Sequence, residues 1–168
     1  MPKQPTKTYT KVNETGCCPK PNVKDWDENK VIWKNKKFIK DSTFCLLHIP
    51  LNMAQMMDRS WKKIQAADAS PPTEEWMMLS YDPSPWKGEH YLSVTKNVPD
   101  ASNVKISGTF LTKVFEGPFK EAPNWMKEME AYVKDKGKKT KKMYFFYTTC
   151  PKCAKHYGKN YVVAFAQV

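Results

Sequence analysis

Two cysteines separated by two residues lie near the end of the chain, in the stretch TTCPKCAKHYG. Cys150 and Cys153 form this CxxC motif, and His156 follows three residues after the second thiol. Loops of this kind present two thiolates to one zinc ion, and a tetrahedral site needs four ligands. Cys17 and Cys18, in the stretch GCCPK, could complete the set. The sequence therefore predicts a structural zinc site of four cysteines, with His156 as an alternative ligand, that clips an N-terminal arm to the loop.

Two other interpretations of these cysteines stay open. The motif can be a plain turn with unligated thiols, or a disulfide or redox pair. A thioredoxin-like pair is disfavoured, because the sequence predicts a hairpin loop here and such a motif normally opens a helix after a strand. Cys45 lies within an apolar strand pattern and is expected to be buried.

Two residues have side chains suited to acid–base catalysis. Glu116 stands between Phe115 and Gly117 at a predicted strand-to-helix turn, where an apolar setting would raise its pKa. His48 falls opposite Glu116 in the internal repeat described below, so an imidazole and a carboxylate could face each other. The plain interpretations are a surface carboxylate near a helix start and a structural histidine.

A spacing of 68 residues recurs along the chain and gives two segments one pattern. It places Pro50 over Pro118, and WMMLSYD at 76–82 over YFFYTTC at 144–150. Each half has the pattern of a strand, a Pro-containing turn, a helix and a hairpin of two strands. The apolar residues of the predicted helices recur at spacings of three and four: Met53, Met57, Trp61 and Ile64, then Trp125, Met129, Tyr132 and Val133. The predicted fold class is α+β, with duplicated β-α-β-β units, an antiparallel sheet and one helix per repeat.

The predicted domain organisation has two parts. Residues 1–41 form an N-terminal arm followed by a short hairpin that turns at Asn35. Residues 42–168 form the folded domain, with repeat one over 42–99 and repeat two over 104–168.

Local signals mark the ends of both predicted helices. Asn52 and Gln55 are expected to form a capping box at the start of the first. Pro123 suits the first turn of the second helix, and Gly137 marks its end.

With this organisation, residues 42–168 resemble the GyrI-like small-molecule-binding superfamily. The stretch SGTFLTKVFEGPFKEAPNWMKEMEAYVKDKG carries the resemblance, because it passes from a strand through the turn Gly117-Pro118-Phe119 into an amphipathic helix. The superfamily includes gyrase-inhibitor proteins, effector-binding domains of transcription regulators, and hydrolases that open cyclopropane-bearing genotoxins. The resemblance implies a stand-alone member with an aromatic ligand cleft between the repeats.

The expected cleft would bind a small aromatic or cationic organic molecule. Its predicted ligand-binding residues are Trp76, Tyr81, Trp86, Glu89, Tyr91, Phe110, Trp125 and Tyr147. Trp86 is the residue expected to be exposed at a rim, and about half of the aromatic residues are expected in the core. Hydrolysis of a cyclopropanoid-type compound, with Glu116 directing a water, is the catalytic version of this hypothesis. The sequence leaves turnover open and predicts no organic cofactor.

Composition limits the remaining functions. The net charge is +11, but Arg59 is the only arginine, and Lys is less suited than Arg to bidentate recognition of phosphates and guanine. Specific nucleic-acid binding is therefore not expected. The alternative function is a metal-stabilised interaction module with nonspecific nucleic-acid contact through lysines. No membrane-spanning stretch or secretory signal is found, so a cytoplasmic location is expected; the sequence does not indicate an oligomeric state.

Overall fold

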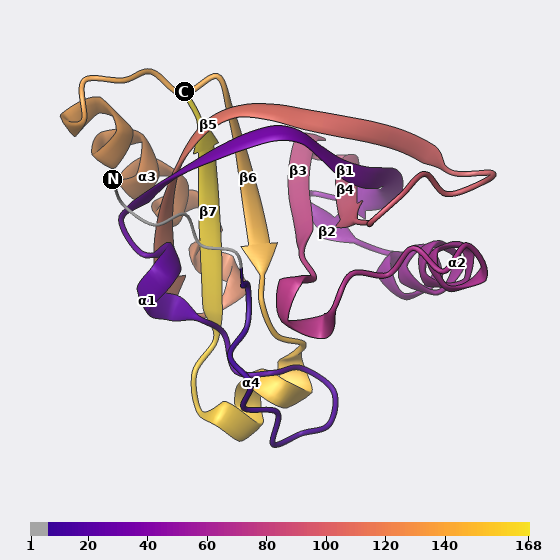
Figure 1. Cartoon of the computed structure of the whole chain (residues 1–168). Coiled ribbons are helices and arrows are strands. Elements are labelled where there is room, and N and C mark those ends of the chain that lie inside the picture. Colours follow the sequence, from indigo (N-terminus) through magenta and orange to yellow (C-terminus); the bar gives the residue numbers. More distant parts are fainter. Residues whose placement is uncertain (1–6) are drawn as a thin grey trace. The chain divides into compact units, whose positions relative to one another are not determined.

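The computed structural model describes residues 7–168, which form two compact units (Figure 1). Unit 1 contains the residues up to Trp33, then Thr73–Glu75 and Gly108–Val168. Unit 2 contains Lys34–Pro72 and Trp76–Ser107. Two long strands, β1 (Asn29–Leu46) and β5 (Ser102–Glu116), contribute residues to both units.

In unit 2 the second part of β1 is followed by β2 (Ile49–Pro50), helix α2 (Met53–Ala66), and the hairpin of β3 (Met78–Ser84) and β4 (Lys87–Ser93). The strands lie in the order β2-β1-β4-β3, and neighbouring strands are antiparallel. Strand β4, the last of this unit's three main strands in the chain, therefore lies between β1 and β3.

Unit 1 has the same order of its main elements. After β5 come the short 3-10 helix η2 (Phe119–Glu121), helix α3 (Ala122–Asp135), β6 (Lys142–Tyr147), helix α4 (Pro151–Tyr157) and β7 (Tyr161–Gln167). The strands lie antiparallel in the order β5-β7-β6. The structure confirms the prediction of an α+β fold with antiparallel strands, whereas duplication of the two units stays a prediction.

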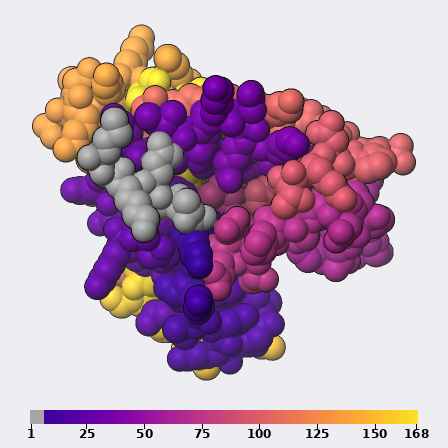
Figure 2. All heavy atoms as spheres, viewed as in Figure 1, coloured from indigo at the N-terminus to yellow at the C-terminus, as the bar shows by residue number. Residues whose placement is uncertain are grey.

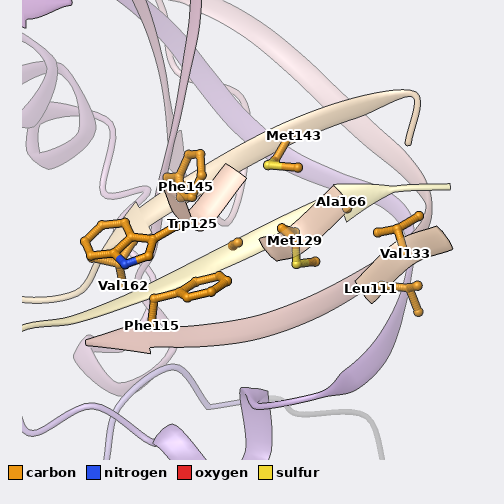
Figure 3. Packing of buried hydrophobic residues seen from close by; sticks show 10 residues of the cluster. Leu111, Phe115, Trp125, Met129, Val133, Met143, Phe145, Val162 and Ala166 are labelled. Carbon is orange, nitrogen blue, oxygen red and sulfur yellow. The ribbon is translucent and has the colours of Figure 1, made fainter. Parts of the chain in front are cut away.

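One face of the unit 1 sheet packs against α3 (Figure 3). Trp125, Met129 and Val133 are buried along one side of the helix, as the spacing predicted, and Phe115 stacks on Trp125 with ring centroids 5.9 Å apart. Pro123 lies in the first turn, and Gly137 follows the helix with a positive φ of 68°. Both predicted boundaries are therefore confirmed.

The N-terminal arm covers the other face of the unit 1 sheet. Tyr9 and Trp26 are 4% and 3% exposed, and Trp26 ends the short helix α1 (Val23–Trp26). Tyr9 contacts Phe146 edge-on at 6.0 Å, and Trp26 contacts Phe165 at 5.2 Å. The arm is therefore part of the core of unit 1.

Helix α2 is turned slightly from its predicted orientation. Its fully buried residues are Met56, Ser60 and Ile64. Of the predicted apolar face, Ile64 is buried, whereas Met53, Met57 and Trp61 are half-buried at its edge. The Ser60 hydroxyl donates a hydrogen bond to Asp41 at 2.9 Å. This polar contact brings Ser60 onto the sheet, and apolar periodicity could not predict it.

The predicted capping box is also wrong. Asn52 occupies the N-cap position of α2, but its side chain makes no capping hydrogen bond. Instead, Asn52 Oδ1 accepts a hydrogen bond from the backbone N–H of Phe44 at 2.8 Å. Asn52 thus ties the helix start to β1.

The predicted hairpin at Asn35 is wrong as well, because β1 runs without interruption from Asn29 to Leu46. Asn35 has a positive φ of 52°, and its N–H donates a hydrogen bond to Ser107 Oγ at 2.8 Å. An asparagine tolerates this left-handed conformation within a strand as well as in a turn. No helix among residues 7–168 is long and apolar enough to cross a membrane.

Candidate functional site

Four cysteines from the two ends of unit 1 form one cluster. The Sγ atoms of Cys17, Cys18, Cys150 and Cys153 all lie within 4.8 Å of one another. Sulfur atoms of a tetrahedral zinc–thiolate site, at about 2.3 Å from the metal, are separated by about 3.8 Å. The Cys17 and Cys18 sulfurs are 3.7 Å apart. The donor set therefore fits a structural zinc ion with little rearrangement.

The loop of the arm positions the first two thiols. The Thr15 hydroxyl accepts hydrogen bonds from the backbone N–H groups of Cys17 and Cys18, at 3.3 and 3.2 Å. The Tyr157 hydroxyl donates to the Cys18 carbonyl at 2.8 Å, which joins this loop to α4. In the space-filling view, atoms of the arm cover part of the C-terminal region around α4 (Figure 2).

A short helix positions the other two thiols, so the predicted hairpin loop is wrong here. Cys150 is the N-cap of α4, Pro151 is its first residue, and Cys153 lies in its first turn, 1% exposed. Gly158 ends the helix with a positive φ of 77°. The CxxC motif thus opens a helix after strand β6, which is the usual setting of a thioredoxin-like pair and differs from the predicted hairpin loop.

The protein environment separates the pKa values of these thiols. Hydrogen bonding to Thr15, and then to neighbouring cysteines, lowers the pKa of Cys153 from its ordinary value. Burial raises the pKa of Cys18, and the pKa of Cys17 is also raised. The cluster therefore favours its first negative charge on Cys153, where Thr15 and the other thiols support it.

His156 does not belong to the cluster. Its Nε2 atom lies 3.0 Å from Glu14 Oε2 in an exposed contact between α4 and the arm. The four sulfurs supply a complete tetrahedral set without it.

Three of the predicted ligand-binding residues lie together on one face of the unit 2 sheet. Tyr81 pairs with Glu89 across β3 and β4, and the Tyr91 hydroxyl donates to Glu89 Oε2 at 3.0 Å. Lys40 on β1 holds the other carboxylate oxygen at 2.9 Å, and Lys87 lies 3.6 Å from it. This buried carboxylate, 9% exposed, is the centre of a polar cluster.

Two opposing effects set the pKa of Glu89. Burial raises it, but hydrogen bonds from Lys40 and Tyr91 outweigh burial, so the pKa lies below its ordinary value. Glu89 is therefore ionised at neutral pH and can accept a proton, while its charge is balanced by Lys40 and Lys87.

The other predicted ligand-binding residues are dispersed. Trp86, in the β3–β4 turn, is 53% exposed, as predicted for a rim residue, and Trp76 precedes β3 and is half-buried. In unit 1, Phe110 is fully buried against Trp33 on the face that the arm covers. Trp125 and Tyr147 lie on the opposite face, with α3. These three unit 1 residues therefore cannot line one cleft.

The two predicted catalytic residues are both exposed. Glu116 lies 3.4 Å from Lys159 Nζ, and its side chain is 53% exposed, so the apolar setting expected for it is not found. His48 has a 52% exposed side chain and lies 3.7 Å from Asp82. Glu116 is thus paired with Lys159 in unit 1, and His48 lies near Asp82 in unit 2.

A buried polar network, which no sequence pattern predicted, lies between the unit 2 sheet and α2. His90 contacts Ser80 Oγ through Nδ1 and Thr43 Oγ1 through Nε2, both at 2.9 Å. Burial lowers the pKa of His90 from 6.5 to about 4, although Asp41 opposes this shift. Arg59 binds both carboxylate oxygens of Asp41, at 2.6 and 2.8 Å. The only arginine of the chain was the available signal, because Arg is suited to such bidentate pairs.

Solved structures similar to this chain include the following two, of which the first shares its general fold. The crystal structure of an uncharacterized conserved protein from Listeria innocua is 10% identical, with a TM-score of 0.58, and the alignment covers 82% of this chain and 90% of that one. The structure of SAV2435 bound to tetraphenylphosphonium is 12% identical, with a TM-score of 0.47, over 83% of this chain and 91% of that one.

Sequence comparisons give a family. No curated protein matches the chain. A family model described as bacterial hydrolase matches residues 8–168. None of these descriptions names the GyrI-like superfamily, so that resemblance stays a prediction. The match spans nearly the whole sequence, and the chain therefore belongs to the bacterial hydrolase family.

Proposed function

We propose that this protein hydrolyses a small organic molecule and that Glu89 directs the attacking water. The observation that carries the proposal is the buried, ionised carboxylate of Glu89, held by the Lys40 ammonium and the Tyr91 hydroxyl. Membership of a family of bacterial hydrolases agrees with this chemistry. Glu116, the residue that the sequence favoured for this role, has an exposed carboxylate and offers less of the desolvated setting that general-base catalysis uses.

The proposed step is general-base hydrolysis. Glu89 accepts a proton from water, the water oxygen bonds to an electrophilic carbon, and the bond from that carbon to its leaving atom breaks. The electron pair goes to the leaving atom, which then takes the proton that Glu89 received. Tyr91 keeps the carboxylate in place, and Tyr81, opposite Glu89, supplies an aromatic surface for the substrate.

An aromatic substrate suits this site, because Tyr81 and Tyr91 lie beside Glu89 on the same sheet face. Lys40 and Lys87 already balance the negative charge of Glu89, so any preference for a cation comes from the tyrosine ring faces. Tetraphenylphosphonium and tetraphenylborate have the same shape and opposite charge, so the pair tests the charge preference directly. We expect tryptophan fluorescence to report tighter binding of the phosphonium, and Glu89→Gln, which leaves Lys40 and Lys87 unbalanced, to shift the preference toward the borate.

Turnover tests the catalytic part. A panel of aromatic esters, lactones and activated cyclopropanes is incubated with the wild type, Glu89→Gln and Glu116→Gln, and products are identified by mass. We expect Glu89→Gln to reduce kcat by about a hundredfold or more, and Glu116→Gln to stay near wild type. Loss of activity in Glu116→Gln alone would return the role to Glu116 and reject Glu89.

We further propose that the four-cysteine cluster binds one zinc ion with a structural role. The chemistry of four thiolates in a tetrahedral arrangement supports zinc, and the cluster joins two segments more than 130 residues apart in the chain. His156 and Glu14 would then support the same junction from outside.

Elemental analysis of the purified protein tests this second proposal. We expect one zinc per chain, released when the thiols are titrated with an organomercurial. Cys153→Ser should bind zinc much more weakly, while Cys45→Ser, a buried thiol outside the cluster, should keep it. A metal-free protein after purification with zinc present would reject the site.

The shared strand order of the two units supports the further proposal that they arose by duplication.

A further inference from the structure

Six large apolar side chains lie exposed on unit 2, close together in the structure. More than half of the surface of each is exposed: Phe44 67%, Leu46 52%, Leu47 66%, Ile49 60%, Leu51 59% and Trp86 53%. We call these six residues the apolar patch. Only four other large apolar residues are strongly exposed among residues 7–168, and they lie elsewhere in the chain.

Hydrogen bonds and strand pairing make the patch continuous. Leu46 pairs with Ile49 across β1 and β2, and the Leu51 N–H donates to the Phe44 carbonyl at 2.9 Å. The Cys45 N–H donates to the Trp86 carbonyl at 2.8 Å, which places the β3–β4 turn beside β1. Opposed residues of antiparallel strands share one face, so the side chains of Leu46 and Ile49 point to the same side.

The turn at the tip of the patch has a left-handed backbone conformation at residues that do not favour it. Leu47 and His48 form the two-residue turn between β1 and β2, with positive φ values of 49° and 69°. Asn and Gly are preferred in such turns, because other residues are strained in the left-handed conformation. A leucine that is strained and two-thirds exposed is better explained by contact with a partner than by the turn itself.

The charge distribution selects a partner. The chain has 28 lysine and arginine residues against 17 acidic ones, yet residues 41–61 contain no lysine. That segment carries two aspartates and one arginine, and Arg59 is paired with Asp41. Lys87, next to Trp86, lies 3.6 Å from Glu89. Two copies of a chain with a net charge of +11 would repel each other over most of their surface. The repulsion is weakest at the apolar patch, where lysines are few.

The same distribution argues against other partners. An anionic lipid surface attracts clusters of lysine around an inserted apolar tip, and the segment around this tip lacks them. Strand addition from another protein is hindered because β2 is only two residues long and contains Pro50.

The size of the patch also suits self-association. The six side chains expose on the order of 700 Å², which approaches the ~800 Å² per partner of a standard protein interface. In a two-fold dimer each residue of the patch faces the same patch on the other copy, so no complementary partner is needed.

We propose that the apolar patch is the interface of a homodimer, with the β1–β2 turn of each copy packed on the patch of the other. This inference does not depend on the proposed hydrolase activity or on zinc. Because the contact is apolar and the rest of the surface is positive, added salt should screen the repulsion and strengthen the dimer.

Sedimentation equilibrium of the full chain tests the proposal. We expect a monomer–dimer equilibrium at about 10 to 100 μM, with the dimer favoured as sodium chloride is raised. Leu47→Lys should weaken dimerisation at least about a hundredfold, because two-fold symmetry places the new charge in both copies. Leu51→Lys should act in the same direction. Met126→Lys, an equal change at an exposed residue of α3, is the matched control and should dimerise like the wild type.

Three results would overturn the inference. The first is a wild type that stays monomeric up to about 100 μM at high salt, a concentration at which a standard interface would be occupied. The second is a dimer that Met126→Lys disrupts and Leu47→Lys does not. The third is a monomer whose patch binds phosphatidylglycerol vesicles, with binding lost in Leu47→Lys, which would assign the patch to a membrane surface. Thermal unfolding of both variants like the wild type, measured at about 1 μM where all are monomers, shows that each result concerns association.

Discussion

If the four-cysteine cluster binds zinc as proposed, removal of the metal should release one segment of the N-terminal arm and leave its flanks docked. The segment is residues 11–20, most of whose side chains are exposed. Apart from the thiols, it is joined to α4 by the Tyr157 hydroxyl on the Cys18 carbonyl and by the exposed Glu14–His156 pair. The proposed metal would therefore supply most of the attachment of this segment.

The flanks are held by much larger contributions. Tyr9 and Trp26 are almost fully buried, and two such aromatic side chains contribute up to about 10 kcal/mol at ~25 cal/mol per Å². A neutral hydrogen bond and an exposed ion pair together contribute about 2 kcal/mol, so the metal-free segment should retain an amide protection factor of only about 30.

Hydrogen exchange measured by mass spectrometry tests this difference. Peptides within 11–20 should exchange rapidly after chelation, whereas peptides that contain Trp26 should keep their protection. Cys18→Ser should reproduce the effect of the chelator, and Cys45→Ser should not. Equal exchange in the metal-loaded and chelated protein, or simultaneous loss of protection in the segment and around Trp26, would refute the reasoning.

Three further outcomes follow from individual contacts. Because folding lowers the pKa of His90 from 6.5 to about 4, the unfolded chain binds a proton between these pH values that the folded chain does not. The free energy of unfolding should therefore fall by about 3 kcal/mol as the pH is lowered from ~6.5 to 4. Urea unfolding at pH 7.5 and 5 measures this fall, and His90→Gln should reduce it. Gly88→Ala should destabilise unit 2 by about 1–3 kcal/mol, because an added Cβ would lie 2.6 Å from Thr43 Oγ1; Gly16→Ala, with open space but a positive φ, should cost about 1 kcal/mol in thermal unfolding. Asn52→Ser should lose about 1 kcal/mol although serine is a good N-cap, whereas Asn52→Asp keeps the acceptor for Phe44 and should stay near wild type in the same assay.

Periodicity predicted the main elements because the cores of the two units follow it. Trp125, Met129 and Val133 lie on one side of α3 as their spacing requires. Helix α4 was not predicted because it has only seven residues and one buried residue, Cys153, so it shows no apolar periodicity. Pro151 at its start and Gly158 after its end were the available signals. Asn35 was misassigned because its partner, Ser107, lies 72 residues away.

The site was predictable where the chemistry depends on residue type and not where it depends on distant contacts. Four thiols have few uses other than metal or disulfide, so the cluster could be proposed before its geometry was known. Aromatic residues occur in cores as well as in binding clefts, so residue type alone does not predict their role. Phe110 was predicted to line a cleft, but the N-terminal arm covers its sheet face, where Trp26 contacts Phe165. The sequence pattern of the arm did not predict this contact.

The proposed role of Glu89 is tested most directly by the fate of solvent oxygen. Hydrolysis of a substrate from the panel in ¹⁸O-labelled water should place one labelled oxygen in the product formed by the wild type. Glu89→Gln should form that product at about a hundredth of the rate or less, while its unfolding curve stays close to wild type. Full-rate incorporation by Glu89→Gln, or a product without solvent oxygen, would contradict the account.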